Sequence, residues 1–289
     1  MSEPVNMHLT ARIQFLLNKA GWGSIQVTPD EFNEVEHSLE DERKHIKYTY
    51  NSFTGILRFR MPTWMHESAI TWMNRWVMQM VLLGDVDLKS LDVCTNVTLR
   101  NFQGRYLQSQ KIPDMFVIPK VPATPTNNTI WPTVALEIGY SESFDALKQD
   151  ADLLLQGSEG RIKTVILVKL EPLKEDETII QAGFVEVHVF DPDSGQRRKR
   201  GRRMTLYPPP RNRAHQGIRL EWEDILRDQL DLHLSESERP PPLMLDDLRE
   251  QIEDYTMRHL LQREQETDIP TDGGTTENDE DDDSEDDGS

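Results

Sequence analysis

The sequence has almost no cysteine and no long apolar run. Cys94 is the one cysteine among 289 residues, so no disulfide can form within the chain. The longest apolar stretches, such as the run at residues 165–170, are far shorter than the roughly 18–20 residues that span a bilayer. No basic start is followed by an apolar run of signal-peptide length. We therefore expect an intracellular protein, nuclear or cytoplasmic, that does not enter a membrane.

Residues 264–289 have no Lys or Arg and almost no apolar side chain. They hold thirteen of the 51 acidic residues, so the rest of the chain has 38 acidic residues against 32 Lys and Arg, a net charge of −6 compared with −19 for the whole. Such a segment cannot bury enough apolar surface to offset the entropy lost on ordering. We expect a disordered acidic tail that is suited to basic protein partners.

The ordered part is expected to be one domain at residues 46–263, after a polar lead-in at residues 1–45 that holds one short helix. Alternating apolar and basic residues predict a hairpin at residues 47–60. Apolar residues three and four apart predict a helix at residues 65–81 with one face on a core. A further helix is expected at residues 245–261, just before the acidic tail.

The clearest pattern in the chain is a strand, a helix and a strand. Residues 133–138 and 164–169 are nearly continuous apolar strands, and residues 144–155 between them have helical character. This order predicts a crossover with two parallel neighbouring strands. With the earlier strand candidates at residues 93–99 and 115–118, it indicates an α/β fold in which helices flank a central mixed sheet.

Three short motifs follow one another along the chain. The segment Arg-Phe-Arg-Met-Pro-Thr-Trp-Met-His-Glu ends at Glu67, Pro-Asp ends at Asp114, and Glu-Ile-Gly-Tyr-Ser-Glu-Ser begins at Glu137. This succession resembles the Uma-type restriction-endonuclease-like family of the PD-(D/E)xK nuclease superfamily and similar fungal proteins. The resemblance covers roughly residues 47–190. It implies a restriction-endonuclease-like core.

The resemblance also implies metal-dependent hydrolysis of the phosphodiester bonds of DNA or RNA. Asp114 and Glu137 would hold Mg²⁺ or Mn²⁺, the hard cations that oxygen ligands suit, with Glu67 as a further ligand. The superfamily often has Lys two residues after the Glu, where this chain has Gly139. We expect Lys169 or Lys148 to supply the missing positive charge, with a slight preference for Lys169 because the ends of parallel strands meet at one edge.

Other interpretations of these residues stay open. Glu137 lies in an apolar strand and needs a partner, which could be a metal ion, Lys169 or an Arg in a buried ion pair. Asp114 could be a turn residue, and His66 could cap a helix or orient a phosphate. The serines after Glu137 are suited to N-capping the next helix. A catalytically inactive interaction protein on the same fold is therefore the alternative to a nuclease.

One dense basic cluster stands out, at or near the tip of an expected hairpin around residues 191–195. It could contact DNA or RNA phosphates, serve nuclear import, contact the acidic tail or simply be solvated. With the tail, it would suit a nuclear adaptor. The cluster comprises Arg197, Arg198, Lys199, Arg200, Arg202 and Arg203.

Overall fold

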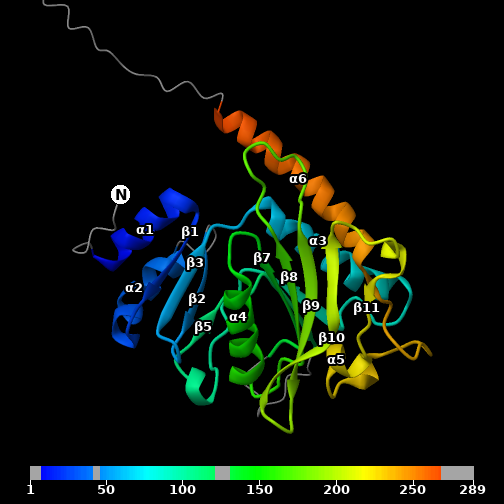
Figure 1. The fold of residues 1–289 in the computed structure, drawn as a ribbon. Helices are drawn as coiled ribbons and strands as arrows, with labels where there is room; N and C mark the ends of the chain where they lie inside the picture. The colour runs from blue at the N-terminus through cyan, green and yellow to red at the C-terminus, as the bar shows by residue number, and fades with distance from the viewer. Residues whose placement is uncertain (1–7, 42–45, 121–130, 268–289) are drawn as a thin grey trace, which may run out of the picture.

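The computed structural model describes residues 8–41, 46–120 and 131–267. Within this part of the chain, six strands form a central mixed sheet in the order β10-β9-β8-β7-β6-β4 (Figure 1). Its strands are β4 (Leu91–Cys94), β6 (Met115–Pro119), β7 (Val134–Gly139), β8 (Thr164–Leu170), β9 (Gly183–Asp191) and β10 (Gln196–Tyr207).

The predicted crossover is confirmed at the centre of this sheet. Strands β7 and β8 are parallel, from Val134 opposite Thr164 to Gly139 opposite Lys169, and helix α4 (Phe144–Gly157) connects them. Ser143 caps this helix, with its Oγ accepting a hydrogen bond of 3.1 Å from the backbone N–H of Ala146, as the sequence suggested. All the other neighbouring strands in the sheet are antiparallel, so it is mixed.

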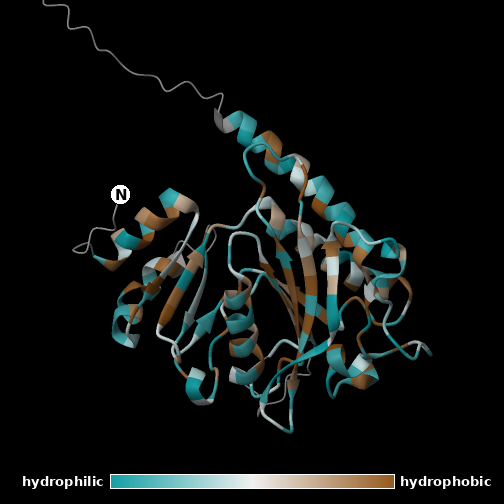
Figure 2. Ribbon diagram, viewed as in Figure 1, coloured by the Kyte–Doolittle hydropathy of each residue, from teal (hydrophilic) through white to brown (hydrophobic). Residues whose placement is uncertain are grey.

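Helices cover both faces of the central sheet, which explains the continuous apolar runs in β7 and β8. Leu136 and Ile138 face a core shared with α3 (Trp64–Leu82) and α6 (Leu245–Thr267). Ala135 faces the opposite core, which α4 covers. Figure 2 shows hydrophobic residues along the central strands and hydrophilic ones on the visible side of α4. No helix among the described residues is long and apolar enough to cross a membrane.

A second, smaller sheet includes residues that the sequence suggested were a lead-in. Its strand order is β1-β3-β2-β5, and β1 pairs with β3 from Trp22 opposite Arg60 to Gln26 opposite Ile56. Residues 8–41 are therefore folded against the expected hairpin, and their apolar side chains cover one of its faces. This layer contains α1 (Leu9–Ala20), β1 (Trp22–Gln26), α2 (Pro29–Asp41), β2 (Lys47–Asn51), β3 (Ile56–Arg60) and β5 (Gln110–Lys111).

The basic cluster lies within strand β10 and begins at Arg197, directly after the Gln196–Asp191 pair that closes the predicted hairpin. Residues Gln196 to Arg200 pair with β9, and a bulge then separates the Arg200–Val187 pair from the Met204–Val185 pair.

The acidic residues 268–289 lie outside the described part of the chain. The remaining elements are η1 (Gly104–Tyr106), η2 (Arg213–His215), β11 (Gly217–Ile218), α5 (Trp222–Leu226), η3 (Leu230–Leu232) and β12 (Leu243–Met244).

Candidate functional site

Asp114 and Glu137 lie side by side where two antiparallel strands meet. The pairing of β6 with β7 sets Met115 opposite Leu136, so Asp114 and Glu137 are the next residues of the two strands. The Oδ2 of Asp114 accepts a hydrogen bond of 2.8 Å from the backbone N–H of Ile138. Both carboxylates are buried, with exposed fractions of 0% and 2%. The sheet register thus brings together the two acids that the motifs singled out.

Asp114 is paired with a buried arginine of the small sheet. A nitrogen of the Arg60 guanidinium lies 2.5 Å from Oδ1 of Asp114, and the Nε of Arg60 lies 3.4 Å from Glu142. Burial raises the pKa of Asp114, but the charge of Arg60 outweighs it, and the pKa lies well below its usual range. Asp114 is therefore ionised, and each of its oxygens already has a partner.

Glu137 is paired with Lys111, a residue that the sequence analysis did not single out. The Nζ of Lys111 lies 3.1 Å from Glu137 and 2.8 Å from Asp150 of helix α4. Asp150 also forms an ion pair with Arg58, which donates a second hydrogen bond of 2.7 Å to Gln149. Lys111 thus takes the position beside Glu137 that we expected Lys169 or Lys148 to fill.

Burial dominates the proton affinity of Glu137. Loss of solvation raises its pKa to about 8; Lys111 opposes this change, while Asp114 and Asp150 add to it. Its Oε1 has no hydrogen-bond partner among the described residues. A proton on Glu137 at neutral pH is consistent with a cluster in which Asp114 and Asp150 already hold negative charge and have lowered pKa values.

The four cations of this cluster come from the small sheet, and the acids come from β6, β7 and the α4 region. Arg58 and Arg60 alternate along β3 with Leu57 and Phe59, which face the apolar core under α1 and α2. This alternation gives β3 one apolar and one charged face, both buried. We call these residues the charged layer: Lys47, Arg58, Arg60, Lys111, Asp114, Glu137, Glu142 and Asp150.

The two lysines that the sequence suggested have other contacts. The Nζ of Lys169 donates to the backbone oxygens of Tyr140 at 3.2 Å and Leu170 at 2.8 Å. Lys148 lies on the outer side of α4 and pairs with Asp145 at 2.6 Å. Neither amine forms an ion pair with Glu137 in the part of the chain that the structure describes.

Gly139, at the position where the superfamily motif often has Lys, is packed closely against helix α4. A Cβ atom at residue 139 would lie 2.6 Å from the Cδ1 of Leu147, nearer than side chains pack. Leu147 is fully buried in the core on this face of the sheet. A lysine at this position would therefore require the Leu147 side chain to shift within the core.

His66 and Glu67 open helix α3 beside the charged layer. The backbone N–H of Thr63 donates to the Nδ1 of His66 at 3.1 Å, so this histidine closes a capping box. Burial and the charge of Arg60 lower the pKa of His66 to about 3, which keeps it neutral. Glu67 is exposed, and partial loss of solvation raises its pKa. Helix capping thus accounts for His66.

The charged layer encloses little space. A cavity of about 10 Å³ lies among its residues, room for about one water molecule. Among residues 8–41, 46–120 and 131–267, no three His, Cys, Asp or Glu side chains are grouped so that they could hold a metal ion. A divalent cation prefers a cage of oxygen ligands and water, and four positive side chains surround these acids. The arrangement does not fit Mg²⁺ or Mn²⁺.

Most of the basic cluster on β10 is also paired within the protein. Arg197 lies 2.7 Å from Asp152, Arg200 lies 2.5 Å from Asp224, and Arg203 lies 2.8 Å from Glu186. Lys199 lies more loosely, 3.7 Å from Glu186. In the described chain, Arg198 and Arg202 have no ion-pair partner. The cluster therefore presents fewer free positive charges than its sequence suggests.

No protein-family model matches the chain, and the curated proteins compared with it give no match.

Proposed function

We propose that the chain is a non-catalytic interaction protein built on a restriction-endonuclease-like core. The resemblance of the motifs around Asp114 and Glu137 supports the choice of core, as does the adjacency of these two acids across β6 and β7. One observation carries the loss of catalysis: the acids that would hold a metal ion are instead paired with arginine and lysine side chains of the same chain.

The energetics of buried charge favour this interpretation. Removing one partner of a buried ion pair typically costs about 3–5 kcal/mol, because the other charge stays buried without compensation. A metal ion bound between Asp114 and Glu137 would have to displace Arg60 and Lys111 from 2.5 and 3.1 Å. It would also have to shed water that Mg²⁺ gives up reluctantly. The charged layer thus serves to join the two sheets and not to activate water.

The test compares cleavage and metal binding by the full chain. Plasmid DNA and a single-stranded RNA are incubated with the protein and Mg²⁺ or Mn²⁺, and Mn²⁺ binding is measured by isothermal titration calorimetry. We expect no cleavage and no stoichiometric binding. Cleavage that Glu137→Gln abolishes, with Asp145→Asn as the exposed control, would refute the proposal and establish the nuclease that the motifs predicted.

The interaction itself is tested at the acidic C-terminus. Residues 268–289 contain eleven acidic and no basic residues, a composition suited to basic protein partners. We expect the full chain to bind a lysine-rich peptide in fluorescence anisotropy and a chain ending at residue 267 to bind it much more weakly. Equal affinity of the two chains, or binding that 0.5 M salt does not weaken, would contradict an electrostatic adaptor role.

A further inference from the structure

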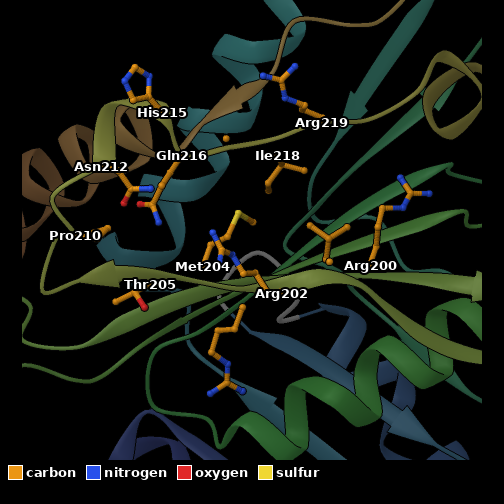
Figure 3. A pocket seen from close by; sticks show the side chains of 14 residues that line it. Arg200, Arg202, Met204, Thr205, Pro210, Asn212, His215, Gln216, Ile218 and Arg219 are labelled. Atoms are coloured by element: carbon orange, nitrogen blue, oxygen red, sulfur yellow. The ribbon is translucent and has the colours of Figure 1, made fainter.

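A concave basic surface lies away from the charged layer, beside strand β10. A cavity of about 530 Å³ opens between β10, the turn η2 and β11 (Figure 3). This volume is within the range of about 300–1,000 Å³ that small-molecule sites occupy. Its rim carries arginines from two elements, Arg200, Arg202 and Arg203 on β10 and Arg219 just after β11. No aspartate or glutamate lines this cavity.

A bulge in β10 shapes the floor and rim of this cavity. The strand pairs Arg200 with Val187 and then Met204 with Val185, so three residues of β10 stand opposite one residue of β9. Gly201 begins the bulge with φ of 71°, a left-handed conformation that glycine adopts without strain. Bulges redirect side chains at sheet edges. Arg202 follows this glycine and borders the cavity in Figure 3.

The lining arginines differ in whether their charge is already neutralised. Arg200 is held by Asp224, and Arg203 is held by Glu186. Arg202 and Arg219 have no ion-pair partner among the described residues, although the chain as a whole carries a charge of −19. Two free guanidinium groups at one cavity are suited to an anion, and the planar donor set of arginine matches phosphate oxygens.

The remaining lining residues are suited to an organic group attached to a bound phosphate. Val187 and Ile218 form an almost fully buried apolar floor, and Met204 supplies partly exposed apolar surface. Asn212 and His215 add exposed polar side chains at the rim. A cavity with positive charge and apolar surface has the two features that a nucleotide needs, one for its phosphates and one for its base.

We propose that this cavity binds a nucleoside phosphate, with Arg202 and Arg219 contacting its phosphates and with Met204 against its base. The inference goes beyond the proposed function and holds whether or not the charged layer can hydrolyse nucleic acid. A polymer is the less suitable ligand, because Arg197, Arg200 and Arg203 are bound to acids of the chain and do not extend the free positive charge along β10.

The test uses the full chain with ATP, AMP and inorganic phosphate as probes in isothermal titration calorimetry, with EDTA present. We expect ATP to bind more tightly than AMP, and AMP more tightly than phosphate. The double variant Arg202→Ala/Arg219→Ala should weaken ATP binding by about tenfold or more, because each charge-assisted hydrogen bond to phosphate is lost. The control Arg198→Ala removes a free arginine of the same strand that does not line the cavity, and should leave affinity within about twofold.

Several results would overturn the inference. These are no binding of ATP at millimolar concentration, equal affinity for ATP and inorganic phosphate, or equal weakening by Arg198→Ala and the double variant. Tight binding of a 12-nucleotide single strand without binding of ATP would assign the arginines to a nucleic acid and overturn it too. Since EDTA removes divalent metal ions, none of these results bears on catalysis at Asp114 and Glu137.

Discussion

Glu137 should make the stability of the protein fall as the pH rises from about 5 to 8. In the folded chain, burial raises the pKa of Glu137 to about 8, compared with 4.5 for the exposed group. Between these two values the folded state holds a proton that the unfolded state has released. The free energy of unfolding therefore decreases with increasing pH across this window, because the unfolded state binds fewer protons. The stabilisation is complete below pH 4.5 and is lost as the pH passes 8.

The size of the effect follows from the proton affinity. A tenfold change in affinity is worth about 1.4 kcal/mol, so a rise in the pKa from 4.5 to about 8 corresponds to roughly 5 kcal/mol. The variant Glu137→Gln keeps the shape of a protonated glutamate and cannot ionise. The difference in unfolding free energy, wild type minus variant, should therefore fall by about 1.4 kcal/mol per pH unit near pH 6–7.

The assay is urea denaturation of wild type and Glu137→Gln at half-unit steps from pH 4.5 to 8.5. The difference between the two proteins is needed because His66 acts in the opposite direction: its pKa of about 3 in the folded chain makes stability rise with pH up to about 6.5. That contribution is common to both proteins and cancels. Parallel stability curves would refute the raised pKa and indicate that Lys111 keeps Glu137 ionised.

Three further predictions concern the same framework. Asp114→Asn should lower the free energy of unfolding by about 3 kcal/mol in urea denaturation, because buried Arg60 loses its nearer carboxylate and keeps only Glu142 at 3.4 Å; a loss below 1 kcal/mol would contradict the role of this pair. Lys111→Met should lower the free energy of unfolding by a similar amount, whereas Lys148→Met on the outer side of α4 should change it by no more than about 0.5 kcal/mol. Equal changes in the two variants would argue against Lys111 as the central cation. A chain that starts at residue 46 should aggregate in size-exclusion chromatography because it exposes the apolar face of β3, and a soluble monomer with unchanged thermal stability would show that the N-terminal layer is dispensable.

The sequence predicts those parts of the fold that have a strong local pattern. The crossover from β7 through α4 to β8 follows from two apolar runs around an amphipathic helix, and helix α3 follows from its three- and four-residue spacing. The first part of strand β10 has no such pattern, because residues 196–203 are almost all charged or glycine and have no period of two. It is a strand because pairing with β9 fixes its backbone while its arginines bind acids of α4, α5 and β9.

The acidic residues of the candidate site were predictable from the sequence, but the basic residues that pair with them were not. Asp114 directly precedes β6 and Glu137 lies in β7, two strands with clear apolar patterns, so the adjacency of the two acids follows once these strands are paired. Lys111 lies in a strand of two residues, too short to have a periodicity, and reaches Glu137 through pairing of β5 with β2. The alternation of Arg58 and Arg60 with apolar residues was visible, but only the packing of β3 against the central sheet shows that its basic face is buried.

Helix α4 connects the close packing at Gly139 to the charged layer. Leu147 occupies the space that a side chain at residue 139 would need, so a lysine there would require the Leu147 side chain to move. Glu137 is buried beside this helix and needs a polar partner, since an unpaired buried polar group is costly. Lys111 supplies that partner from the small sheet, and it is held there by Asp150 as well as Glu137. The same helix positions Asp150 to bind Arg58 and Lys111. The position of one helix therefore accounts both for the close packing at Gly139 and for the acid that holds Lys111 beside Glu137.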